Sequence, residues 1–172
     1  MKKMAKLAFP VESKFCLRIN LERNNMKTVR EILQSKGNAV WSVLPESTVY
    51  EALQLMAEKN VGALLVIKND RVVGIMSERD YARKIILHGK HSKDTLVKEI
   101  MSSLVIYVNT TLSVEECMAL MINKRIRHLP VIENGRLSGI ISIGDVVNAI
   151  IDEKEFVIDQ LVHYITGVPV LK

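Results

Sequence analysis

The chain has 172 residues, a formal net charge of +5, and 48% hydrophobic residues with a mean hydropathy of +0.15. These values are typical of a packed globular protein rather than a disordered chain, and the length allows one domain or two small ones. No apolar run approaches the roughly 18 residues that a membrane-spanning helix needs. Only 5% of the residues are aromatic, which disfavours a protein that stacks single-stranded nucleic acid on aromatic rings.

The segment 1–25 is basic and differs from the rest of the chain. It carries Lys2, Lys3, Lys6, Lys14, Arg18 and Arg23 against Glu12 and Glu22. The two acidic residues and the shortage of serine disfavour an organellar transit peptide. We expect either an arm with a strand at 15–21 or an extension ahead of a start at Met26. Thr28 and Glu31 have the spacing of a capping box, which predicts a short amphipathic helix over 26–33.

The rest of the chain is a tandem repeat. A shift of 65 residues aligns the segment 49–86 with the segment 114–151 without a gap. The matching pairs include Val49/Val114, Glu51/Glu116, Met56/Met121, Val66/Val131, Asn69/Asn134, Arg71/Arg136, Gly74/Gly139, Ser77/Ser142 and Asp80/Asp145. This period exceeds that of common solenoid repeats, so each copy is expected to be a small domain. We place the first domain at 26–95, with its core at 36–88, and the second at 96–172.

Each copy is predicted to contain an extended segment, a helix, a hairpin of two strands and a second helix. In the first copy the extended segment is 39–43, the first helix begins after Thr48, the strands are 63–67 and 71–75, and the second helix is 78–88. In the second copy the extended segment is 104–108, the first helix begins after Ser113, the strands are 128–132 and 136–141, and the second helix is 143–153. Asn134-Gly135 favours a tight hairpin turn because both positions tolerate positive φ. Pro130 lacks a backbone N–H and is therefore expected at a strand start or edge.

A last helix is predicted at 155–166, stopped by Gly167 and Pro169. Its apolar positions favour packing against the body or against a second subunit. The two cysteines, Cys16 and Cys117, lack the spacing of a metal site, and Cys117 falls on the apolar face of a predicted helix. This usage indicates a reduced, cytoplasmic protein.

One short signature occurs in both copies, at 74–80 and at 139–145. In each, a serine follows a strand and an aspartate stands three residues later, where a helix begins. One interpretation is a capping box, in which serine and aspartate only satisfy free amides of the helix. The other is a site for a phosphorylated sugar, because a helix N-terminus favours phosphate and a carboxylate can accept from two hydroxyls. The spacing alone leaves both open.

Together, the capped helices, the hairpins, the paired signatures and the stretches 77–81 and 126–131 resemble a pair of cystathionine-β-synthase (CBS) domains, also called a Bateman module. The resemblance covers about 36–166. It implies an α/β (α+β) fold of two pseudo-twofold-related domains, each a small sheet flanked by two helices. It also implies two clefts between the domains that hold adenine nucleotides or related adenosyl ligands.

The resemblance assigns the aspartate of each signature to the ribose hydroxyls and the serine to phosphate. The first cleft would then use Ser77, Arg79 and Asp80 with Ile75, faced by Ile126, Arg127 and His128. The second would use Ser142 and Asp145 with Ile140, faced by Val61 and Gly62 and by the segment from Asn38 to Val40. The first cleft has cationic neighbours and the second does not, so we expect tighter binding of a charged ligand at Asp80.

No catalytic arrangement is recognised in the sequence, and the resemblance implies a stand-alone regulatory module rather than an enzyme. The expected ligand is AMP, with ADP, ATP, NAD(H) and S-adenosylmethionine as relatives, and no metal is required. The expected partners are a second copy in a homodimer and a regulated protein; no membrane is involved, and nucleic acid is disfavoured. The alternative is a structural or interaction module whose clefts are empty.

Overall fold

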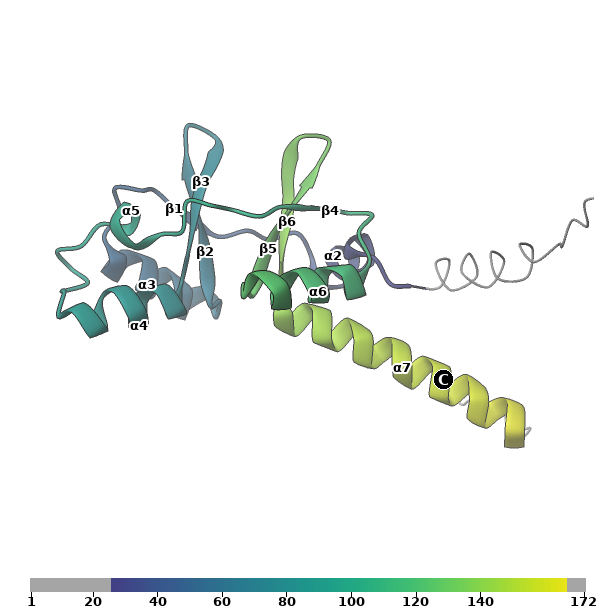
Figure 1. The fold of residues 1–172 in the computed structure, drawn as a ribbon. Helices are drawn as coiled ribbons and strands as arrows, with labels where there is room; N and C mark the ends of the chain where they lie inside the picture. Colours follow the sequence, from purple (N-terminus) through teal and green to yellow (C-terminus); the bar gives the residue numbers. More distant parts are fainter. Residues whose placement is uncertain (1–25, 167–172) are drawn as a thin grey trace, which may run out of the picture.

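The computed structural model describes residues 26–166, which form two similar halves lying side by side (Figure 1). The first half contains β1 (Ser42–Val43), α3 (Val49–Lys59), β2 (Ala63–Lys68), β3 (Arg71–Ser77), α4 (Glu78–Lys84) and the 3-10 turn η1 (Ile86–His88). The second contains β4 (Val108–Asn109), α6 (Val114–Lys124), β5 (His128–Glu133), β6 (Arg136–Ser142) and α7 (Ile143–Thr166). Two further helices, α2 (Val29–Lys36) and α5 (Val97–Ile100), precede β1 and β4. The α+β architecture is as predicted.

Each half contains a three-stranded sheet with the same topology. The order is β1-β2-β3 in one sheet and β4-β5-β6 in the other, with the first pair parallel and the hairpin pair antiparallel. The hairpin turns place Asn69, Asp70, Asn134 and Gly135 at positive φ, as the turn residues predict. A register shift follows Val66 in one hairpin and Val131 in the other, so the repeat extends to the irregularities of the strands.

Capping boxes start most of the helices. In α3 the Glu51 carboxylate accepts from the amide of Thr48, and Ser113 and Glu116 form the same box ahead of α6. Thr28 and Glu31 cap α2, which begins and ends three residues later than predicted. Because each box satisfies amides that a helix start leaves free, the sequence fixes these boundaries locally.

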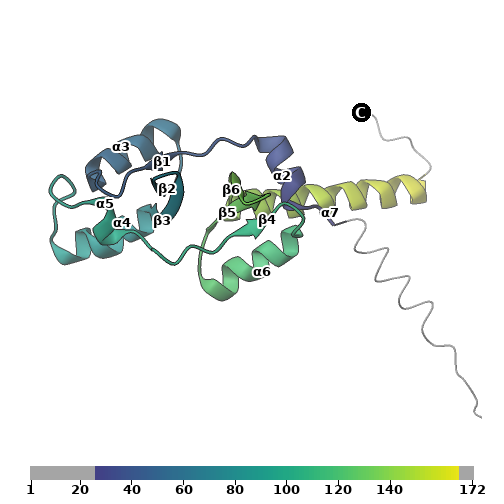
Figure 2. The same cartoon turned by 90° about the horizontal axis from the view of Figure 1, so that it is seen from above.

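The helix ahead of each copy packs into the other half of the structure. Val29, Ile32 and Leu33 of α2 join the core of the second half, and Val97 and Ile100 of α5 join the core of the first. A backbone hydrogen bond attaches each of these helices to the half in which it packs. Val29 N donates to Leu112 O at 3.0 Å, and Val97 N donates to Ser47 O at 2.9 Å. Figures 1 and 2 both show α2 beside β6 and α7. The sequence-based limits had grouped α2 with the first copy and α5 with the second.

Three further expectations differ from the structure. The predicted helices at 143–153 and 155–166 form one continuous helix, α7, because nothing between them breaks a helix. The predicted helix at 78–88 is α4 followed by the 3-10 turn η1. Pro130 is the third residue of the central strand β5, where its missing N–H is tolerated because β4 pairs only from Val131 onward. The expected strand at 15–21 and the helix stop at 167–169 lie outside the described residues.

Candidate functional site

The first signature opens onto a cavity of about 410 Å³ between the two halves. Its walls come from the start of α4, from the segment that follows α5, and from the end of α6 with the start of β5. The lining residues that carry charge are Glu78, Arg79, Asp80, Arg83, Lys84, Arg125 and Arg127, with His128 beside them. Five cations against two carboxylates make this cavity electropositive. Its size lies within the range of small-molecule sites.

The serine and aspartate of the first signature form a capping box and also face this cavity. Asp80 Oδ2 accepts from the amide of Ser77 at 3.1 Å and from its hydroxyl at 2.7 Å. Lys84, one turn along the same helix, approaches Asp80 Oδ1 to 2.8 Å and also donates to Ile100 O. The carboxylate is therefore held in place, and Lys84 is the group that a pair of ligand hydroxyls would displace from it.

Arg79 links the two halves across the cavity. One of its Nη atoms donates to the carbonyl of Arg125 at 3.0 Å, and Arg125 ends α6 in a left-handed conformation with φ of 53°. This contact was not expected from the sequence. It uses one of the five N–H donors of the guanidinium, so the others stay available to an anion.

His128 lies mostly buried at the start of β5. Burial lowers the pKa of its imidazole; the charge of Asp145 opposes this shift, and Lys36 and Arg127 add to it. The His128 Nε2 atom lies 4.0 Å from the Cβ position that a side chain at Gly62 would occupy. The two residues therefore meet at the junction between the halves, and His128 stands near both signatures.

The second signature has a different environment. Asp145 Oδ2 accepts from the amide of Ser142 at 2.6 Å, from its hydroxyl at 2.8 Å, and from Lys36 Nζ at 2.6 Å. Burial raises the pKa of Asp145, but the hydrogen bonds from Lys36 and Ser142 outweigh it, and the net shift is downward. The expectation that this aspartate lacks a charged neighbour is wrong, because α2 brings Lys36 into the second half.

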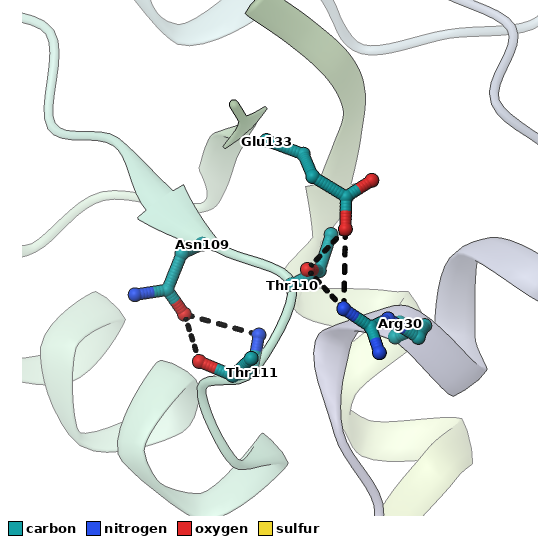
Figure 3. Close-up of polar contacts among 5 residues, drawn as sticks. All are labelled: Arg30, Asn109, Thr110, Thr111 and Glu133. Atoms are coloured by element: carbon teal, nitrogen blue, oxygen red, sulfur yellow. Dashed lines mark hydrogen bonds and ion pairs between the residues drawn. The ribbon is translucent and has the colours of Figure 1, made fainter. Parts of the chain in front are cut away.

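A polar cluster at the other end of the β5–β6 hairpin, near its turn, anchors α2 (Figure 3). Arg30 donates to Thr110 Oγ1 and to Glu133 Oε1, both at 3.2 Å, and the Thr110 hydroxyl donates to Glu133 at 2.8 Å. These residues line a second, more open hollow together with Leu33, Gln34, Gly37, Asn38 and Ser138. Their polar atoms bond to one another, so we interpret the cluster as support for α2.

The structure brings together all seven residues expected at the first cleft. Ser77, Arg79, Asp80, Ile75, Ile126, Arg127 and His128 all line the cavity. Gly62, which was expected beside Asp145, lines it as well, while Val61 packs against the core of the first half. Asn38 lines the hollow beside Arg30 instead of facing Ser142, and Val40 and Ile140 are half-buried.

Sequence reasoning missed several lining residues of the cavity. They are Glu78, Arg83, Lys84, Ser102, Leu104, Val105, Ile106, Arg125 and Pro130. Arg83 and Lys84 follow Asp80 at helical spacing, and the segment 102–106 corresponds to the segment expected at the other cleft. Both signals were present in the repeat.

The CBS domain family model matches residues 29–87 and 97–152, which include both signatures. The chain belongs to the CBS domain family. Proteins that consist of such domain pairs are generally regulatory rather than catalytic. Within residues 26–166, no helix is long and apolar enough to cross a bilayer, and no cluster of His, Cys, Asp or Glu is placed to hold a metal ion.

Relatives and solved structures agree with this assignment. The chain is 40% identical to the mitochondrial CBS domain-containing protein CBSX3 of Arabidopsis thaliana, over 81% of this chain and 72% of that protein. A protein with CBS domains from Burkholderia ambifaria is 50% identical with a TM-score of 0.72, over 73% of this chain and 95% of that one. The CBS domain pair of protein MJ0100, solved with 5'-methylthioadenosine and S-adenosylmethionine, matches with a TM-score of 0.64 over 73% of this chain and 96% of that one. At 22% identity, the last shows the fold alone.

Proposed function

We propose that this CBS domain pair is a non-catalytic sensor of an anionic adenine nucleotide, with AMP as the leading ligand, and that it binds this ligand in the cavity at Asp80. The observation that carries the proposal is the cavity itself: it combines a carboxylate at a helix start with five cationic side chains. The carboxylate suits ribose hydroxyls, and the cations suit phosphate.

The charge of the cavity favours nucleotides over sulfonium ligands. A cationic sulfonium centre gains nothing from Arg79, Arg83 and Arg127, whereas each phosphate group gains charge-assisted hydrogen bonds. The domain pair of MJ0100, crystallised with S-adenosylmethionine, shows that the same fold accommodates an adenosyl ligand in that protein. We therefore expect AMP, ADP, ATP and NAD(H) to bind more tightly than S-adenosylmethionine.

Isothermal titration calorimetry with AMP tests this function, with Asp80→Asn as the test variant and Asp145→Asn as its matched control. Asparagine keeps an oxygen that accepts from the preceding serine, so both helix starts retain a cap. We expect Asp80→Asn to weaken AMP binding about tenfold or more, since a hydrogen bond to a charged group contributes roughly 1.5–3 kcal/mol. Asp145→Asn is expected to bind AMP like the wild type.

Two results would contradict the proposal. If no member of the nucleotide panel binds the wild type, the chain is instead a structural or interaction module. If Asp145→Asn is the damaging change, the nucleotide binds at the other signature.

Ligand binding would be read out by partners. Because Arg79 joins α4 to the end of α6, a phosphate bound by its remaining donors would change the position of this guanidinium and the link between the halves. We propose that a regulated protein detects this change and that the chain acts as a homodimer. The cytoplasmic location inferred from cysteine usage also stays a proposal, since the Arabidopsis relative is named as mitochondrial.

A further inference from the structure

A lysine of the chain itself, Lys36, forms an ion pair with the aspartate of the second signature. Lys36 Nζ lies 2.6 Å from Asp145 Oδ2, the same oxygen that accepts both hydrogen bonds from Ser142. The two side chains of this ion pair keep only 31% and 22% of their exposure, so water screens the pair less than a surface salt bridge. Asp145 is therefore neutralised by a group of the chain itself.

The position of Lys36 is fixed by the packing of α2. Lys36 is the last residue of this helix, and Leu33, one turn earlier, packs so closely on β6 that a Cβ at Gly139 would come within 2.7 Å of it. The Arg30 cluster holds the same helix from another side. Moving Lys36 by more than a rotamer change would require α2 to leave the second core.

The lysine at the first signature is placed differently: it contacts Asp80 Oδ1 and leaves Oδ2 to Ser77, and it does not come from a helix that packs in from the other half. When α2 is matched to α5 by their packing, Val29 corresponds to Val97 and Lys36 corresponds to Leu104, which is 88% exposed and lines the cavity. The lysine that contacts Asp80 is Lys84, from the same helix as Asp80, and it lies in the cavity wall. Neither Ser142 nor Asp145 lines either of the two hollows described above.

We propose that Lys36 closes the second signature to nucleotides and so limits the chain to one nucleotide per CBS pair. This inference rests on the proposed function, since it concerns which of the two signatures accepts the same ligand. A ribose at Asp145 would have to displace the Lys36 ammonium from an oxygen that already accepts both hydrogen bonds from Ser142, and the packing of α2 holds this lysine beside it. Lys36 is thus the residue that makes the two halves unequal.

Calorimetric stoichiometry with AMP tests the proposal on the full chain. Lys36→Met removes the charge and keeps most of the apolar stem, and Lys27→Met serves as control because it removes a lysine from the exposed pair with Asp152 beside the same helix. We expect one AMP per chain for the wild type and for Lys27→Met, and two for Lys36→Met. Adding Asp145→Asn to Lys36→Met is expected to return the count to one. Thermal unfolding of each variant verifies that it is folded.

The possible outcomes separate this proposal from the proposed function. Two AMP molecules on the wild type, or one on folded Lys36→Met, would overturn the role of Lys36 and leave nucleotide sensing intact. If the wild type binds no AMP, the proposed function fails. In that case the role of Lys36 is supported only if Lys36→Met binds one AMP per chain and loses it when Asp145→Asn is added. If Lys36→Met binds no AMP, the role of Lys36 is contradicted as well.

Discussion

At the scale of single residues, His128 makes folding sensitive to pH. Burial lowers the pKa of this imidazole in the folded state, while the unfolded chain has the ordinary value of about 6.5. Below that value the unfolded chain binds a proton that the folded chain refuses, so stability falls as the pH drops from about 6.5 through the folded pKa. Urea unfolding at pH 7.5 and 5.5 is expected to show a larger loss of stability in wild type than in His128→Gln.

The comparison with His128→Gln isolates this one group. Glutamine is neutral at both pH values, and the other histidines of the chain are present in both proteins, so their contributions cancel. Carboxylates with ordinary pKa values stay ionised over this range. Equal losses in the two proteins would mean that the folded imidazole takes up its proton as readily as the unfolded one.

At the scale of elements, α2 belongs energetically to the half that it does not adjoin in sequence. Leu33 is 4% exposed and packs in the second core. Leu33→Ala is expected to lower the free energy of unfolding by about 2–5 kcal/mol, the usual cost of emptying a buried leucine site. Hydrogen exchange should show the loss of protection first in β5 and β6, although these strands lie about a hundred residues further along the chain.

Leu44→Ala provides the matched control for this experiment. Leu44 is 59% exposed and follows β1, so the same change there is expected to cost less than about 0.5 kcal/mol. If Leu33→Ala destabilised the protein no more than Leu44→Ala, α2 would not be part of the second core in solution.

The elements also show what the sequence could and could not predict. Capping boxes, hairpin turns and apolar spacing are local, and both hairpin turns and the helix starts predicted after Thr48, at 78, after Ser113 and at 143 are present. In contrast, α2 begins three residues later than predicted and no helix starts at 155. The exchange of α2 and α5 depends on contacts between distant segments, for which the repeat gave no signal. Lys36 was overlooked for this reason: its partner became apparent only once α2 was placed. The division of α7 at its acidic stretch was wrong because Glu and Lys favour helices.

At the scale of the whole molecule, α7 extends away from the body (Figures 1 and 2). Exposed apolar residues line one face along most of its length. Exposed apolar residues recur at alternating spacings of three and four positions, interrupted once by Lys154: they are Val147, Ile151, Ile158, Leu161 and Ile165. A repeat of 3.5 residues is the seam of a coiled coil, which a second copy of the same helix complements. We therefore place the proposed homodimer contact on this face.

Light scattering after size-exclusion chromatography tests this contact. The double change Ile158→Glu and Leu161→Glu puts two charges on the seam, and we expect it to convert a dimer into a monomer. Both side chains are more than half exposed and outside the two cores, so the fold is expected to survive, which circular dichroism verifies. Phe156→Glu is the control, because Phe156 is 61% exposed but lies on the opposite face of the helix, at 100° per residue. A monomeric wild type, or a dimer that Phe156→Glu disrupts equally, would show that the seam is not the contact.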